Sequence, residues 1–366
     1  MPLMIQRKLL LNILLLLLLY SEYLFSYNYT VREKSRGESS SIYPEITENY
    51  IYNPSLLAIN KQVILTPIEI NFYSDKDSWT LVQNYKKFEN LKDNDIINLI
   101  KEYNNKYLSL DLKLNTSFIW RSFSFALQGR SLFDALIKEK DVIPTLEYYT
   151  FEEIKLYISY GFKINKNLYI GLSLKNSYAL SYYIREKALD IYNDETIINP
   201  IKNAKKNKDI DLDIAMLWEN KINENLMVYL GNNLSNLNLY SNDIDDGSYY
   251  EVNHFFLRSG AGLALNSKKY NTRVVFSYGH INDFREDSLV NDQKDNQLGI
   301  GFDFFQQFHV GIGYSHNNLT YGFSYSSDNI SLGYASFVDK SPFLSLSHYK
   351  RRNGYYLRIS YPFTPK

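Results

Sequence analysis

The sequence predicts an all-β fold, a transmembrane antiparallel β-barrel of about fourteen strands, with sixteen as the next alternative. Three observations predict it: a leader typical of secretion, apolar and polar side chains that alternate along most of the chain, and carboxylates on one face of a strand. The 366 residues include 34 Tyr and 21 Phe, 40 basic and 40 acidic side chains and no Cys. We expect one barrel, because all-β barrels often exceed 200 residues as single units.

The first segment predicts secretion. Arg7 and Lys8 precede the apolar run 9–19, and Ser21 and Ser26 offer cleavage points. The run is shorter than the about 20 residues of a transmembrane helix, so a signal peptide is favoured over a membrane anchor. The expected division is residues 1–26 as signal peptide, residues 27–62 as N-terminal plug segment and residues 63–366 as outer-membrane β-barrel.

Alternation of side chains is clearest in the last third of the chain, at 298–304, 308–315, 319–326 and 330–335. Neighbouring side chains of a strand point to opposite faces, so each segment has one apolar face and one small or polar face. A barrel strand places only every second side chain on lipid, which is compatible with the mean hydropathy of −0.33. We therefore expect a meander of hairpins.

Charged residues mark the inner face of the predicted barrel. Asp209, Asp211 and Asp213 alternate with apolar residues, and Arg258 lies on the polar face of a later segment. A dry core requires each buried charge to be paired or neutralised, whereas a wet lumen tolerates it. These four residues are predicted to face the lumen, and they argue against the alternative of a soluble secreted β-sandwich.

The connections are of two kinds. Residues 163–168 and 221–226 are near copies, KINKNL and KINENL, and both predict a tight turn that opens a strand. The long polar stretches 185–208, 241–253 and 282–296 are expected at the opposite, external rim.

Two stretches depart from the strand pattern. Residues 90–103 and 131–140 carry apolar residues at spacings of three and four, which predict short amphipathic helices. We expect helical connections at a rim, in preference to helices that bind a partner.

The segment before the first expected strand, 63–72, carries Asn53-Pro54-Ser55-Leu56-Leu57-Ala58. It resembles the Asn-Pro-Ala-x-Leu-Ala element of the FadL-type superfamily of outer-membrane proteins, which includes PorV-like and TraF-like members. The resemblance implies fourteen strands, a location in the bacterial outer membrane and an N-terminal segment that enters or closes the barrel. An Asp-rich link at 75–77 and a short helix near 93–103 would fit the TraF-like branch. The expected plug motif is Asn53, Pro54, Leu56, Leu57 and Ala58, with Ser55 in place of the usual Ala.

The end of the chain resembles a barrel-closing strand. Residues 355–363 alternate apolar and polar side chains and end in Tyr361 and Phe363, followed by three further residues. Outer-membrane barrels typically end in such an aromatic strand, which the assembly machinery recognises. Tyr361 and Phe363 are the expected barrel-closing residues, with membrane lipid and the assembly machinery as partners.

Catalytic and metal sites are not predicted. Ser315-His316 and Ser347-His348 are adjacent pairs, whose side chains face opposite ways on a strand. The polar cluster 279–287 is interpreted as a solvated loop in preference to a metal or protease site. Asp209, Asp211 and Asp213 could bind a cation such as calcium together, but a lumen wall is favoured. The protein is therefore not expected to be an enzyme, and no cofactor is expected.

Composition excludes further classes of function. Zero net charge without a basic cluster argues against nucleic acid as a partner. The absence of Cys excludes disulfides, thiol catalysis, Cys-ligated zinc and a lipoprotein anchor. Abundant Tyr and Phe are typical of the aromatic girdles at the two membrane interfaces.

The expected function is an outer-membrane channel or transporter for small molecules, hydrophobic ones included, with a lumen gated by about residues 27–58. A small hydrophobic ligand is implied by the resemblance. The alternative is a non-transporting barrel that acts as scaffold or shuttle for a secretion or conjugation apparatus, with a secretion-system partner bound at 185–208 or 241–253.

Overall fold

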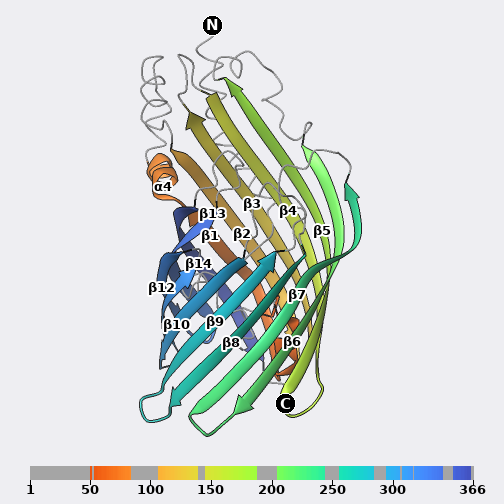
Figure 1. The fold of residues 1–366 in the computed structure, drawn as a ribbon, viewed down its shortest axis with the longest axis vertical. Coiled ribbons are helices and arrows are strands. Elements are labelled where there is room, and N and C mark those ends of the chain that lie inside the picture. Colours follow the sequence, from red (N-terminus) through yellow and green to blue (C-terminus); the bar gives the residue numbers. More distant parts are fainter. Residues whose placement is uncertain are drawn as a thin grey trace.

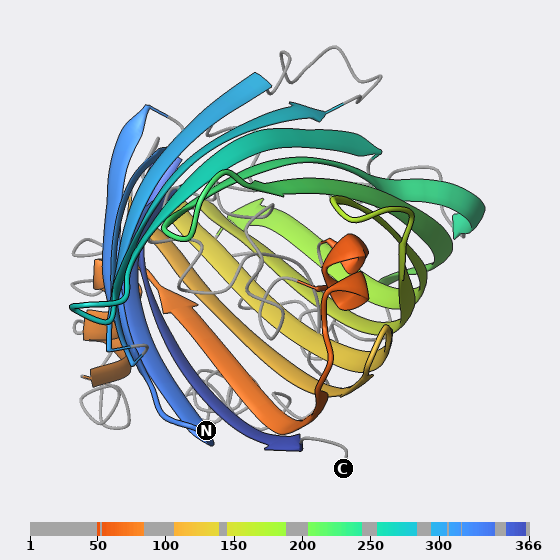
Figure 2. The same ribbon diagram turned by 90° about the horizontal axis from the view of Figure 1, so that it is seen from below.

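The computed structural model describes residues 50–51, 53–83, 106–138, 145–187, 204–243, 255–283, 294–305, 307–315, 317–340 and 349–363. These residues form fourteen antiparallel strands in one closed sheet, in which each strand pairs with its sequence neighbours and β1 pairs with β14 (Figures 1 and 2). The prediction of a fourteen-stranded all-β barrel is confirmed. The strands are β1 (Val63–Ser74), β2 (Tyr107–Trp120), β3 (Phe123–Lys138), β4 (Thr145–Lys163), β5 (Leu168–Lys187), β6 (Lys205–Lys221), β7 (Leu226–Asp243), β8 (Phe256–Ser267), β9 (Thr272–Asp283), β10 (Lys294–Phe304), β11 (Phe308–Ser315), β12 (Asn318–Ser326), β13 (Ile330–Lys340) and β14 (Tyr349–Phe363).

The two faces of the sheet are inverted relative to those of a water-soluble protein. Along β11 the apolar side chains of Phe308 and Val310 are exposed, whereas His309 is 2% exposed. On β12, Phe323 is 61% exposed and Ser324 only 3%. An apolar outer face is stable only against lipid. Such a barrel therefore spans a membrane, and the soluble β-sandwich is excluded.

Proline explains the irregularity in β1. Pro67 has no N–H to donate to a neighbouring strand, and proline in a sheet is confined to edges and bulges. The pairing register shifts at this position toward both neighbours, between Leu65 and Ile68 on the β14 side and between Thr66 and Glu69 on the β2 side. Residues three apart on a regular strand lie on opposite faces. Because of the shift, Thr66 and Glu69 both lie on the buried inner face.

The repeated sequence builds the same turn twice. Asn165 Oδ1 accepts hydrogen bonds from the backbone N–H groups of Asn167 (2.9 Å) and Leu168 (3.0 Å). Asn223 Oδ1 accepts from Asn225 and Leu226 at the same two distances. An Asn side chain that bonds its own backbone two residues on stabilises a tight turn. The turns predicted at 163–168 and 221–226 are confirmed.

The barrel wall is uneven in height. The strands β3 to β7 have 16 to 20 residues, whereas β8 to β13 have 8 to 12. A tilted strand needs about 9 to 11 residues to cross the bilayer, so the taller wall continues beyond the membrane. Figure 1 shows β3, β4 and β5 rising past the shorter strands at the rim opposite the short turns.

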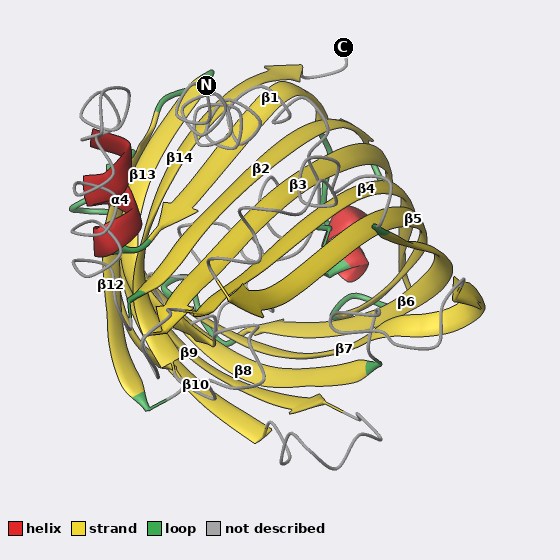
Figure 3. Cartoon of the chain, turned by 90° about the horizontal axis from the view of Figure 1, so that it is seen from above, coloured by secondary structure: helices red, strands yellow, loops and turns green. Residues whose placement is uncertain are grey.

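The helix α4 (Lys76–Gln83) lies outside the ring of strands (Figure 3). Asp75 caps it, because its Oδ1 accepts from the backbone N–H of Asp77 (2.8 Å) and of Ser78 (3.0 Å). The ring centroid of Trp79 lies 6.1 Å from that of Phe72 on β1 and 6.1 Å from that of Tyr355 on β14. Among the described residues, no helix is long and apolar enough to cross a membrane.

Some sequence-based expectations need correction, and others concern residues outside the described ranges. The helix predicted at 131–140 is wrong, because Ser131–Lys138 continues β3 and pairs with β2 and β4. The Asp-rich link at 75–77 is the beginning of α4. The helix predicted at 90–103 and the signal peptide lie outside the described residues. The first long connection at the tall rim is shorter than predicted, since β5 extends to Lys187 and β6 begins at Lys205.

Candidate functional site: the lumen and its N-terminal helix

The N-terminal motif forms one turn of 3₁₀ helix, η2 (Pro54–Ala58). Asn53 begins it: its side-chain oxygen accepts from the backbone N–H of Ser55 (3.3 Å), and its carbonyl accepts from that of Leu56 (3.1 Å). Pro54 suits the first helical position because its fixed φ is already helical and it has no N–H to satisfy. Asn60 then donates to the Arg121 carbonyl (3.1 Å), which ties η2 to the short turn between β2 and β3.

Two glycines form the seat of η2. Gly161 on β4 and Gly171 on β5 are directly paired, and η2 lies against them inside the ring of strands (Figure 2). A Cβ on Gly171 would lie 2.1 Å from the backbone of Pro54 and Ser55, and a Cβ on Gly161 would lie 2.5 Å from the N of Ala58. Only glycine allows so close an approach of two backbones. We call Gly161 and Gly171 the glycine seat.

Two leucines of η2 complete an apolar layer across the barrel. Leu56 and Leu57 are fully buried and belong to two adjoining clusters. These clusters take one residue from each strand from β1 to β9, and we call them, with η2, the apolar floor. The strand residues of the floor are Ile64, Ile119, Ala126, Tyr157, Tyr169, Leu217, Tyr229, Ala264 and Val275.

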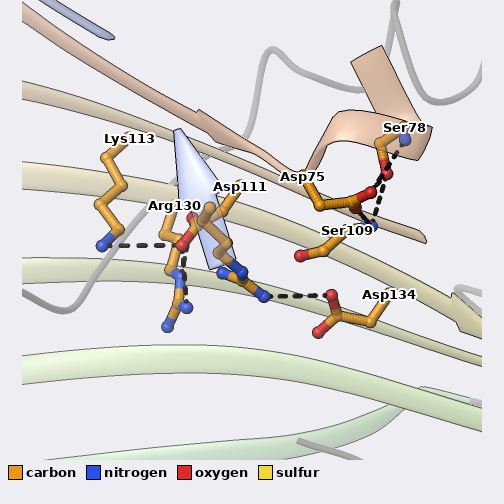
Figure 4. Close-up of polar contacts among 8 residues, drawn as sticks. Asp75, Ser78, Ser109, Asp111, Lys113, Arg130 and Asp134 are labelled. Carbon is orange, nitrogen blue, oxygen red and sulfur yellow. Dashed lines mark hydrogen bonds and ion pairs between the residues drawn. The ribbon is translucent and has the colours of Figure 1, made fainter. Parts of the chain in front are cut away.

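Charged side chains line the inner face of β2 and β3. Arg130 donates from Nε to Asp111 Oδ1 (3.0 Å) and from Nη2 to Asp111 Oδ2 (3.1 Å), and Lys113 Nζ lies 3.6 Å from Asp111 Oδ2 (Figure 4). Arg352 of β14 reaches across to Asp134 Oδ1 at 3.4 Å. Bidentate pairing satisfies both oxygens of a carboxylate, which is how a protein tolerates it in a buried place. These five residues are at most 9% exposed.

The residues predicted to face the lumen all lie on the inner face. Asp209, Asp211 and Asp213 are 3%, 0% and 1% exposed, and Arg258 is 6% exposed. Asp213 pairs with Lys175 Nζ at 2.6 Å and accepts from the backbone N–H of Asn236 at 2.8 Å. Arg258 lies over the ring of Phe256, 4.5 Å from its centroid.

The inner face of β9 to β12 differs from that of β2 to β6 in the size and charge of its side chains. It carries small residues, mostly glycine and serine, and they are buried. The lumen therefore has one wall with large charged side chains and one with small side chains. The small residues of this wall include Ser277, Gly299, Gly301, Gly311, Gly313, Ser315, Gly322 and Ser324.

Other predicted residues lie outside the lumen. Tyr361 and Phe363 are 42% and 54% exposed on the outer face of β14, opposite Leu65 and Val63 of β1. They line the seam at which the first and last strands meet.

Two of the five histidines lie in the described ranges, and each contacts polar side chains. His309 Nδ1 lies 2.6 Å from Asp303 Oδ1, and His280 contacts the side chains of Asn282 and Asn296. Within the described ranges, no three His, Asp or Glu side chains converge as metal ligands. The other three histidines, His254, His316 and His348, lie outside those ranges.

Sequence reasoning missed the glycine seat and the cationic partners of the acids, Arg130 and Lys175. Glycine at alternate positions occurs throughout the inner face, so neither Gly161 nor Gly171 has a distinct local signal. The ion pairs join neighbouring strands, and their register is not visible in the sequence.

A closed, even-numbered antiparallel barrel with an apolar outer face and short turns at one rim is the architecture of bacterial outer-membrane proteins. This protein is an outer-membrane β-barrel. The fourteen strands, and η2 inside them, agree with the resemblance to the FadL-type superfamily. The finer assignment to a PorV-like or TraF-like branch stays a prediction.

The solved structures that match this chain include two toluene transporters and a FadL homologue. The toluene transporter TbuX of Ralstonia pickettii gives a TM-score of 0.49 at 8% identity, over 92% of this chain and 98% of that chain. The toluene transporter TodX of Pseudomonas putida gives 0.48 at 9%, over 94% and 100%. A FadL homologue of Pseudomonas aeruginosa gives 0.48 at 11%, over 93% and 99%. No protein-family model and no curated protein matches the sequence. The fold assignment therefore rests on the pairing and exposure of this chain's own strands.

Proposed function

We propose that this protein is an outer-membrane channel for small molecules, closed at its short-turn rim by the N-terminal segment 27–62. One observation carries the proposal: η2 lies on the glycine seat inside the barrel and contributes Leu56 and Leu57 to the apolar floor. No covalent bond holds η2 against Gly161 and Gly171, so the segment can leave its seat without any change in the strands. Passage is passive, and it begins when the segment shifts.

The proposed cargo is small molecules with a hydrophobic part, the class that the FadL-type resemblance implies. Supporting this class, the floor presents the aromatic rings of Tyr157, Tyr169 and Tyr229 together with Leu56 and Leu57. An apolar body gains free energy when such a surface shields it from water. A molecule that crosses the lumen also passes the charged wall of β2 to β6.

Two partners are proposed with this function. The exposed aromatic residues Tyr361 and Phe363 would be recognised by the outer-membrane assembly machinery, and the apolar outer face contacts membrane lipid. The scaffold function remains the second candidate, favoured by the tall wall of β3 to β7, which offers surface beyond the bilayer to a secretion-system partner.

The test is flux into proteoliposomes and single-channel conductance, measured for the full chain, for a chain lacking residues 27–58 and for Gly171→Ala. Both changes are expected to raise flux and open time, because each removes η2 from its seat. Heat-modifiable gel mobility confirms that each barrel is folded. Flux that stays unchanged in the deleted chain would refute the gate. A complete lack of conductance in all three, with binding of a partner at the tall rim, would favour the scaffold.

A further inference from the structure

A pocket of about 400 Å³ lies at the short-turn rim, which is the lower rim in Figure 1. The turn between β8 and β9, the turn between β10 and β11 and the end of β12 bound it. Its charged lining side chains are Lys268, Arg273 and Asp303, and the ring of Phe308 also lines it. We call it the rim pocket. Its volume is within the range of pockets that hold small ligands or headgroups.

Backbone hydrogen bonds fix the walls of the rim pocket. The N–H of Phe305 donates to the Asn271 carbonyl at 2.9 Å, which joins the β8–β9 turn to the β10–β11 turn. The N–H of Ser326 donates to the Gln307 carbonyl at 2.7 Å, which joins the second turn to β12. The backbone therefore sets the shape of the pocket, and a ligand loses little binding free energy to ordering these turns.

The charges of the rim pocket favour an anion. Asp303 is opposite Arg273 in the pairing of β9 and β10, and its Oδ1 lies 2.6 Å from His309 Nδ1. Lys268 Nζ lies 2.6 Å from Glu224 Oε2, but both side chains are 75% exposed, so solvent weakens this ion pair. Among the described residues, the lining thus carries two permanent cations and one carboxylate. A ligand that brings one negative charge would balance them.

The hydrogen-bonding groups of the rim pocket suit a phosphate ester better than a carboxylate. A guanidinium has five N–H donors and an ammonium three, and both recognise phosphate. A carboxylate offers only its two oxygens, whereas a phosphoglycerol headgroup offers phosphate oxygens, ester oxygens and hydroxyls that both donate and accept. Further side chains of the lining are amides or hydroxyls that can bond such a headgroup: Asn266, Ser267, Asn271, Thr272, Gln307 and Ser326.

The rim pocket lies at the height of lipid headgroups. Exposed aromatic side chains gather at the same ends of β8 to β12, and girdles of such residues mark the membrane interfaces of barrels. Phe308 is 51% exposed on the outer face and lines the pocket as well, so the pocket adjoins the lipid-facing surface. The aromatic residues of this rim, between 37% and 63% exposed, are Tyr270, Phe304, Phe305, Phe308 and Tyr325.

We propose that the rim pocket binds the phosphodiester headgroup of a phospholipid from the leaflet at the short-turn rim. Arg273 and Lys268 bind the phosphate, the amide and hydroxyl side chains bind the rest of the headgroup, and the acyl chains lie along the outer face beside Phe308. The bound lipid fixes the height of the short strands in the membrane. The inference goes beyond the proposed channel function and is independent of it, because neither η2 nor the apolar floor takes part.

The test is native mass spectrometry of the full chain, titrated with phosphatidylglycerol or with the phosphate-free lipid diacylglycerol. Arg273→Gln keeps N–H donors but removes the charge, so it should weaken the binding of phosphatidylglycerol by at least about tenfold. Lys268→Gln should weaken it by roughly threefold, because this ammonium group is more exposed. Lys269→Gln is the matched control: it removes the same charge from the same turn, and Lys269 Nζ lies over the ring of Tyr270, 5.2 Å from its centroid. Its affinity should equal that of the unchanged chain.

Heat-modifiable gel mobility shows that each variant is folded. If Arg273→Gln does not fold, Lys268→Gln carries the comparison, since it changes only an exposed turn residue. Equal affinities of the folded pocket variants and Lys269→Gln would overturn the site. Diacylglycerol that binds as tightly as phosphatidylglycerol would overturn the role of the phosphate. Glycerol 3-phosphate that binds as tightly as the lipid would overturn the lipid assignment and give the pocket to a soluble phosphate ester.

Discussion

Gly171→Ala is the change that most directly tests the contact between η2 and the barrel. The added Cβ would lie 2.1 Å from the backbone of Pro54 and Ser55, and ordinary contact begins at 3.4 Å, so η2 must move by about 1.3 Å. The clashing atoms belong to backbone and cannot rotate away. The strand cannot yield either, since Gly171 is paired on both sides, with Gly161 of β4 and Ala215 of β6.

The magnitude follows from the two leucines that move with η2. Leu56 and Leu57 are both 0% exposed, and full burial of a leucine contributes about 1.5 to 3 kcal/mol. Complete loss of both contacts would weaken the docking of η2 by about 3 to 6 kcal/mol, or about two to four orders of magnitude in its equilibrium constant. A partial displacement gives less, so an increase of at least about tenfold in the undocked fraction is expected.

The assay uses Ser55→Cys, a conservative replacement at a fully buried position of η2 in a chain without other thiols. The rate at which PEG-maleimide reacts with this thiol reports the undocked fraction when opening is faster than labelling. Gly262→Ala is the matched control, because a Cβ there meets its nearest atom at 3.6 Å, an ordinary contact. Equal labelling rates in the Gly171→Ala and Gly262→Ala backgrounds would refute the seat as a determinant of closure.

Three further predictions follow from the lumen and its surroundings. Arg130→Leu removes the bidentate partner of the buried Asp111, which leaves Lys113 at 3.6 Å, and should destabilise the barrel by about 3 to 5 kcal/mol, measured by the temperature at which gel mobility changes. Asp111→Asn in the same background should recover most of the loss, and no recovery would contradict the pairing. Asp75→Ala removes the cap of α4 and one of the two acceptors for the Ser109 N–H, at 2.6 Å, so α4 should be cut faster by protease while the barrel keeps its gel mobility. An unchanged rate of cleavage would refute the capping role. Burial raises the pKa of the Tyr50 hydroxyl, so ionisation of this hydroxyl disfavours the docked state of the N-terminal segment. The contribution of Tyr50 to docking should be complete below pH about 10, the ordinary pKa of tyrosine, and should be lost as the pH rises above that value. Labelling of Ser55→Cys should therefore rise above pH about 10, and a rise that persists in Tyr50→Phe would contradict this origin.

The fold was largely predictable because alternation is a local property. In β11 and β12 each apolar residue faces lipid and each small or polar residue faces inward, so a few neighbours suffice to identify the strand. The Asn-capped turns at 165 and 223 were predictable for the same reason, since the hydrogen bonds that form them lie within three residues.

The error at residues 131–138 shows where local pattern fails. Leu132 and Leu136 face the lumen and pack with Tyr149 and Phe151 of β4, so both faces of this part of β3 carry apolar side chains. The alternation disappears, and the remaining spacing of three and four is typical of a helix. Pairing with β2 and β4 along the whole length of the segment overrides that local preference.

The site was less predictable because its contacts join distant parts of the chain. The motif at 53–58 was visible, but its seat consists of Gly161 and Gly171, which resemble every other inward glycine until the register of β4 and β5 is known. Likewise, the alternating acids of β6 predicted a lumen wall. The ion pair between Lys175 and Asp213 was not predictable, because it depends on the path of the flexible lysine side chain.

The free energy with which η2 docks on the glycine seat is in the range that a two-state switch requires. Two buried leucines and a backbone contact hold η2 with about 3 to 6 kcal/mol. A ligand must favour one of two states by about 5.5 kcal/mol to move them from 1:99 to 99:1. If η2 acts as the proposed gate, docking within that range would keep the closed state dominant and would let a molecule that binds the floor in place of Leu56 and Leu57 reverse the equilibrium. Under the same proposal, a larger apolar helix in this place would bind too firmly for a cargo molecule to displace it.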